Sequence, residues 1–121
     1  MATISEKILA AKSGRKKVEP GEIVEAEVDY IMVNDVTGLP AFEAFEKFDA
    51  RPLREKVVLI PDHYVPNKDV ASAGQAKEMR EFAKKYNLPN YFEVGRAGVC
   101  HQVMIEQGFI APGRLIIGAD S

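Results

Sequence analysis

The sequence has few of the residues that point to disulfides, membranes or nucleic acids. Cys100 is the only cysteine among 121 residues, which excludes an intramolecular disulfide and a metal site built from several cysteines of this chain. We therefore expect a reducing, cytoplasmic setting. No segment approaches transmembrane length, and the opening MATISEKILAAKSG is too polar for a signal peptide. The net charge of −2 provides no global field that would favour nucleic acid.

Glycine-rich phosphate-binding motifs are also missing. The segment GRAGVC, residues 95–100, is too poor in glycine and wrongly spaced for a dinucleotide or P-loop fingerprint. Cys100 next to His101 could suggest a thiol–imidazole nucleophile, but adjacent residues rarely reach that geometry. We therefore interpret Cys100 as a small buried hydrophobic residue.

The remaining composition is that of an ordinary globular domain. Hydrophobic residues make up 46% and charged residues 28%, and the length allows at most one domain. Apolar runs predict strands, and apolar residues at helical spacing predict helices between them. The expected strands are 23–33, 57–61, 91–95 and 114–119, and the expected helices are 3–14, 41–48, 67–87 and 100–108. This alternation predicts the α/β class, with α/β/α layers and a mainly parallel sheet.

Polar residues follow the expected strands at the points where ligands bind in open α/β sheets. The polar residues are Asn34, Asp35 and Thr37 after the first strand, Asp62 and His63 after the second, and Asp120 and Ser121 after the last. A histidine paired with a carboxylate is held in one orientation and can donate a proton near neutral pH. Neighbours in a strand point to opposite faces, so Asp62 and His63 can meet only if the chain turns there.

A purely structural interpretation of these residues stays open at this point. Asp62 and Asp120 can cap turns or helices, and His63 and His101 can be half-buried surface residues. Asn34, Asp35 and Thr37 can bond to local backbone or cap the next helix. The spacing alone does not decide between these roles and acid–base chemistry.

Three segments together resemble the aconitase superfamily. They are TISEKILAAKSG with VEPGEIVEAEVDYIMVNDVTG, then IPDHYVPN, then GRAGVCHQVMIEQGFIAPGRLIIGADS. The likeness covers essentially the whole chain, and it is strongest to the large subunit of the two-subunit hydro-lyases of the isopropylmalate dehydratase and homoaconitase type. In that family GADS is followed by a histidine and a threonine, and the chain continues. The resemblance therefore implies that residues 1–121 are a single partial domain, the beginning of a large subunit.

The resemblance also implies roles for individual residues. Asp62 and His63 match the family's Asp-His pair, whose histidine protonates the leaving hydroxyl. His101 and Asp120 match a second histidine–carboxylate pair. Ser121 matches a serine of the substrate pocket, and Asp35 and Thr37 lie in a loop on the substrate side.

The implied reaction removes water from a 2-hydroxy di- or tricarboxylic acid and adds it back with the hydroxyl moved. The family's four-iron, four-sulfur cluster, which acts as a Lewis acid, is held by cysteines that lie downstream, so we expect no metal ligand in this chain. The expected partners are the remainder of the large subunit and a small swivelling subunit that carries a serine base and arginines. The segment alone is expected to be inactive. The alternative is an α/β binding or assembly module without catalysis.

Overall fold

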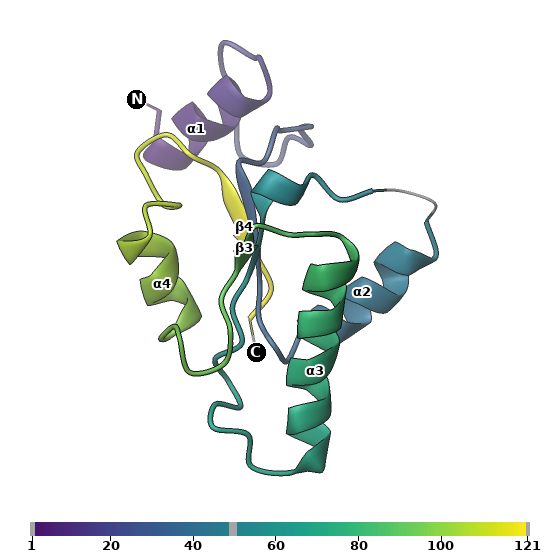
Figure 1. Cartoon of the computed structure of the whole chain (residues 1–121). Coiled ribbons are helices and arrows are strands. Elements are labelled where there is room, and N and C mark those ends of the chain that lie inside the picture. Colours follow the sequence, from purple (N-terminus) through teal and green to yellow (C-terminus); the bar gives the residue numbers. More distant parts are fainter. Residues whose placement is uncertain (1, 49–50, 121) are drawn as a thin grey trace.

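The computed structural model describes residues 2–48 and 51–120, and these form a four-stranded sheet with helices on both faces (Figure 1). The strand order is β3-β2-β1-β4, and every pairing among the described strands is parallel. The strands are β1 (Tyr30–Val33), β2 (Val57–Leu59), β3 (Asn90–Tyr91) and β4 (Ile116–Gly118). The predicted α/β class with a parallel sheet is confirmed.

The helices divide between the two faces of the sheet. Their bounds are α1 (Ile4–Lys12), α2 (Gly38–Glu46), α3 (Val70–Lys85) and α4 (Cys100–Glu106), with a short 3-10 turn η1 (Arg54–Lys56) before β2. In Figure 1, α2 and α3 lie on one side of the strands and α4 lies on the other. Helix α1 opens with the capping box that the sequence TISE predicts, because the Thr3 hydroxyl and the Glu6 carboxylate bond to each other's backbone N–H.

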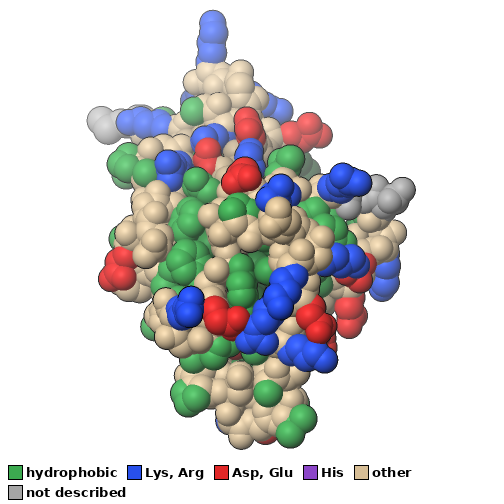
Figure 2. All heavy atoms as spheres, viewed as in Figure 1, with side chains coloured by type: hydrophobic (Ala, Val, Ile, Leu, Met, Phe, Trp, Pro, Cys, Tyr) green, Lys and Arg blue, Asp and Glu red, His purple; other side chains and the backbone are tan. Residues whose placement is uncertain are grey.

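Alternation along the strands produces two apolar layers. Val58 packs with Met104 of α4 on one face, and the neighbouring Leu59 packs with Met79 of α3 on the other. Both strand residues are fully buried, as expected for a parallel sheet covered on two sides. Figure 2 shows hydrophobic side chains gathered in the middle of the molecule between charged side chains.

The strand predicted over 23–33 is too long, since β1 contains Tyr30–Val33 alone. The preceding backbone bonds to other elements. The N–H of Glu27 donates to the carbonyl of Lys12 at the end of α1, and the Lys56 ammonium donates to the carbonyl of Val28, both at 2.8 Å. Ile23 is 95% exposed, so apolar alternation there does not mark a half-buried strand.

The strand order reverses direction between β1 and β4. The chain moves outward from β1 to β2 and β3, then crosses by α4 to place β4 on the other side of β1. Such a reversal is a topological switch point, and the crevice outside the carboxyl ends of its strands is where α/β proteins bind ligands. The residues after β1 and β4 are therefore the first place to look for a site.

Candidate active site

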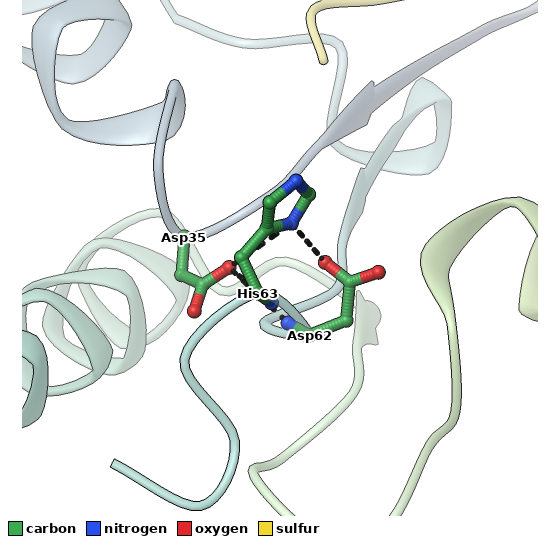
Figure 3. A group of neighbouring side chains, drawn as sticks. All are labelled: Asp35, Asp62 and His63. Carbon is green, nitrogen blue, oxygen red and sulfur yellow. Dashed lines mark hydrogen bonds and ion pairs between the residues drawn. The ribbon is translucent and has the colours of Figure 1, made fainter. Parts of the chain in front are cut away.

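The polar residues that follow the strands converge at one edge of the sheet. Asp62, His63 and Asp120 line a cavity of about 280 Å³ together with Val99, Cys100 and His101 at the start of α4. Figure 3 shows Asp35 from the end of β1 facing Asp62 and His63 from the end of β2. The fold thus gathers residues that lie as far as 86 positions apart in the sequence, such as Asn34 and Asp120.

His63 has a carboxylate at each ring nitrogen. Its Nδ1 lies 2.7 Å from Oδ1 of Asp62, and its Nε2 lies 3.0 Å from Oδ1 of Asp120. The bond to Asp62 raises the pKa of His63 above its ordinary value of 6.5, and the charges of Asp35 and Asp120 add to the rise against partial burial. The ring is therefore favoured as an imidazolium that donates from both nitrogens.

Asp62 is fixed on both of its oxygens. While Oδ1 faces His63, Oδ2 accepts the backbone N–H of Cys100 at 2.6 Å. Burial acts to raise the pKa of Asp62, but the N–H of Cys100 and the imidazole of His63 outweigh it, so the pKa lies below its ordinary 3.8. The carboxylate stays ionised and orients the ring of its neighbour.

Asp35 makes the turn that lets these neighbours meet. Its side chain is 1% exposed, and Oδ1 accepts the backbone N–H groups of Asp62 and His63 at 3.2 and 3.0 Å. Oδ2 accepts the N–H of Tyr64 at 2.9 Å. Asp35 therefore ties the end of β1 to the loop after β2, which is the local backbone role that the sequence left open.

Asn34 and Thr37 connect the end of β1 to the end of β4. The amide nitrogen of Asn34 donates to the carbonyl of Ala119 at 3.1 Å, and the Thr37 hydroxyl lies 3.0 Å from the same carbonyl. Asn34 is fully buried. The sequence placed Asn34 among the polar residues after the first strand, but it did not reveal the bond to the residues after β4.

His101 and Asp120 lie near each other but are not hydrogen bonded. The distance from His101 Nδ1 to Asp120 Oδ2 is 3.9 Å, which is ion-pair range and longer than a hydrogen bond. Asp120 stands closer to His63 and lies between the two imidazoles. Ser121, the expected pocket serine, lies outside the described residues.

Cys100 is a core residue rather than a nucleophile. Its Sγ lies 3.3 Å from Nδ1 of His101, so these neighbours do contact each other, contrary to the sequence-based expectation. The side chain is 1% exposed, and burial raises the pKa of the thiol to about 12. It therefore stays protonated at neutral pH, as the buried-hydrophobic interpretation requires.

The described residues do not supply the ligands of an iron–sulfur cluster, and their one group of possible metal ligands is already hydrogen bonded. Ligand atoms of Asp35, Asp62 and His63 lie within 4.8 Å of one another, but each carboxylate oxygen already faces a backbone N–H or the imidazole. Iron–sulfur clusters are held mainly by several thiolates, whereas the chain has one buried cysteine that stays protonated.

The arrangement is suited to moving protons. An imidazole between two carboxylates, at the switch point of a parallel sheet, can hold a proton and deliver it to a ligand in the adjoining cavity. The fold and the site define an α/β protein that holds a histidine between two carboxylates at the ends of its parallel strands. A model of the aconitase family (aconitate hydratase) matches residues 6–121, and the chain belongs to that family.

Curated relatives agree with this family. Over 98% of its own length, the chain is 50% identical to the 3-isopropylmalate dehydratase large subunit of Thermodesulfovibrio yellowstonii. The chain is also 52% identical to the subunit of that name from Picrophilus torridus, over 100% of the chain. In both cases the match spans 29% of the relative's length. Among the described residues, the helices are all too short or too polar to cross a bilayer.

Proposed function

We propose that this chain is the N-terminal segment of the large subunit of a hydro-lyase that isomerises a 2-hydroxy acid, 3-isopropylmalate dehydratase. The observation that carries the proposal is the placement of His63 between Asp62 and Asp120, in a chain about half identical to subunits of that name. Dehydration needs a proton for the leaving hydroxyl, which departs as water, and rehydration passes a proton from the incoming water back to the same group.

Each residue has a defined part in this proposal. His63 holds the transferable proton at Nε2, the nitrogen that faces Asp120 at the cavity. Asp62 keeps the ring oriented and charged through Nδ1. His101 and Asp120 form the second histidine–carboxylate pair beside it, and they contribute to proton traffic when substrate brings them together. Asp35 and Thr37 stay predictions for the substrate side of the site, and Asp35 in addition orders the loop that carries Asp62 and His63.

The proposed cofactor and partners lie outside the chain. The complete enzyme contains a four-iron, four-sulfur cluster that supplies Lewis-acid chemistry, and its cysteines belong to the remainder of the large subunit. The small subunit completes the site. The substrate is a 2-hydroxy di- or tricarboxylic acid, isopropylmalate in the first place, with homocitrate as the alternative because the same chemistry serves both.

An assay of the complete assembly tests the function. The full-length large subunit is purified without oxygen, combined with its small subunit, and supplied with isopropylmalate and with homocitrate in parallel. We expect isomerisation of isopropylmalate, and a loss of about 100-fold or more in kcat for His63→Gln. Turnover of homocitrate alone would reassign the substrate. An assembly that takes up no iron and dehydrates neither acid would favour a binding module instead.

A further inference from the structure

We propose that Asn34 is a positioning residue that sets where the Asp120 carboxylate stands between His63 and His101. The proposal rests on the acid–base function proposed above. It concerns a fully buried residue that does not line the cavity and acts through its neighbour.

The orientation of the Asn34 amide is fixed by the backbone around it. Its Oδ1 accepts the N–H groups of Val36 and Thr37 at 3.0 and 2.9 Å. Rotating the amide by half a turn would set its NH₂ group against these two donors. The nitrogen Nδ2 therefore points away from its own loop, toward the residues that follow β4.

Asn34 holds those residues where the sheet no longer does. The pairing of β1 with β4 ends at Met32 and Gly118, so Ala119 and Asp120 lie beyond the ladder. Nδ2 of Asn34 donates to the carbonyl of Ala119 at 3.1 Å and reaches Oδ1 of Asp120 at 3.4 Å. A fully buried side chain thus anchors a carboxylate that is itself 46% exposed.

The anchored oxygen is the one that faces His63. Oδ1 of Asp120 lies 3.0 Å from His63 Nε2, while Oδ2 faces His101 at 3.9 Å. Releasing Asp120 from Asn34 lets the carboxylate turn toward His101 or solvent. His63 then loses part of the negative charge that keeps it protonated, and its proton is less well placed for transfer.

The decisive variant is one that keeps the turn after Asn34 and removes the bonds from its side chain to Ala119 and Asp120. In Asn34→Ser the hydroxyl can still accept from the backbone of its own loop, as in serine turns, but it is too short to reach Ala119 or Asp120. Asn34→Ala removes both functions and reports the additional cost of the turn. Asn90→Ala is the matched control, because Asn90 also donates its amide to a backbone carbonyl, that of Glu55 at 3.0 Å, but on the far edge strand.

The variants are made in the full-length large subunit and assayed with the small subunit. NMR of the imidazole resonances, assigned with His63→Gln, follows the titration of His63. For Asn34→Ser we expect a loss of about tenfold in kcat, part of what general acid–base catalysis supplies. We also expect a His63 titration midpoint at lower pH than in the native protein, and a Tm close to native. Asn90→Ala leaves kcat and the titration unchanged.

Measuring both kcat and the His63 titration separates the positioning role of Asn34 from the proposed enzyme function. A His63 titration identical in Asn34→Ser and native protein overturns the positioning role, whatever happens to kcat. A loss of activity that follows the folded fraction alone does the same. If the native assembly turns over neither acid, the proposed function fails, and the titration still decides whether Asn34 positions Asp120.

Discussion

At the scale of single residues, His63 is the group whose surroundings are most completely specified. The Asp62 carboxylate, with its side chain 8% exposed, fixes one ring nitrogen, and the half-exposed carboxylate of Asp120 faces the other. Since both neighbours are negative, the charged form of the ring is the favoured one. The ring is thus kept protonated, which suits it to protonate a poor leaving group such as hydroxide.

Removing the charge of Asp62 tests whether this carboxylate keeps His63 protonated. The pKa of His63 is raised chiefly by its bond to Asp62, so Asp62→Asn lowers that pKa toward 6.5. Activity that needs protonated His63 is lost as pH rises through this pKa, and the alkaline limb of the kcat profile therefore moves to lower pH. The contribution of protonated His63 to stability is complete below 6.5 and likewise fades at a lower pH in the variant.

The pH profile of kcat in the complete assembly provides the measurement. Glu27→Gln is the matched control, because Glu27 is an exposed carboxylate paired with Lys56 and is absent from the residues that line the cavity. An alkaline limb that stays in place in Asp62→Asn would show that another group controls it.

At the scale of elements, the site depends on side chains that join strand ends. Asp35 links β1 to the loop after β2, and Asn34 and Thr37 link β1 to the residues after β4. These bonds take over where the short strands stop pairing. The loops are therefore positioned by buried polar side chains rather than by the sheet itself.

Replacing Asp35 tests the first of these links. In Asp35→Ala three backbone N–H groups, of Asp62, His63 and Tyr64, lose their acceptor in a buried place. We expect a loss of stability of at least about 1–3 kcal/mol, which is the cost of one unsatisfied buried group. Tm of the full-length subunit and hydrogen exchange of the three amides measure it. Native-like protection of these amides would contradict the role.

A second element-scale link joins α3 to the loop after β3. Arg80 holds Glu93 through two hydrogen bonds of 2.7 Å, and this lowers the pKa of Glu93 to about 2 against partial burial. Because the folded pKa is depressed from 4.5, the pair stabilises the fold above about pH 4.5. That stability is lost as pH falls toward about 2.

Glu93→Gln should therefore matter at neutral pH and not in acid. We expect a cost of about 1 kcal/mol at pH 7, because both side chains are about one-third exposed and solvent screens the pair. The difference in Tm between variant and native protein should shrink as pH approaches 2. A difference that is constant with pH would show that packing of the side chain, rather than its charge, is responsible.

Local patterns predicted the elements better than their ends. The apolar run VVLI predicts a covered strand, and Thr3 with Glu6 predicts a helix start, because both signals lie within a few residues. The prediction of a strand over 23–33 was too long because backbone groups of this segment bond to Lys12 and Lys56, which lie elsewhere in the sequence. For the same reason the sequence pointed to Asp62 and Asp120 but did not reveal that they flank one imidazole.

At the scale of the whole molecule, one face of the sheet is incompletely covered. Ile31 and Ile117 are register partners on β1 and β4, and they are 37% and 49% exposed. A cavity of about 330 Å³ lies along them, and β4 is an edge strand. Exposed apolar faces and edges are contact surfaces. Since the match spans 29% of the relatives' length, we expect the remainder of the large subunit to cover this face.

Lysine substitutions test that expectation in two settings. Ile117→Lys should improve the solubility of residues 1–121 expressed alone, because it removes apolar surface from water. In the complete subunit it should lower Tm, since the ammonium would be buried. Ile23→Lys is the control in both settings, because Ile23 is 95% exposed. If Ile117→Lys and Ile23→Lys change the Tm of the complete subunit equally, the face is not covered by the remainder of the subunit.

Residues 1–121 alone should also unfold without a sharp transition. The apolar face and the unpaired edge of β4 leave the segment without part of its packing. Thermal unfolding followed by circular dichroism measures this. A cooperative transition of a soluble monomer would show that the segment folds independently.

The cavity at the strand ends also carries an unusual electrical balance. Its described lining includes the carboxylates of Asp62 and Asp120 and two imidazoles, but neither lysine nor arginine. A substrate with several carboxylates would meet a local potential near zero or negative, with Asp35 buried just behind. We therefore expect capture of such an anion to depend on cations that the described lining of this cavity does not supply. Raising ionic strength should slow substrate association with the assembled enzyme, while the segment itself should show little attraction for the anion at any salt concentration.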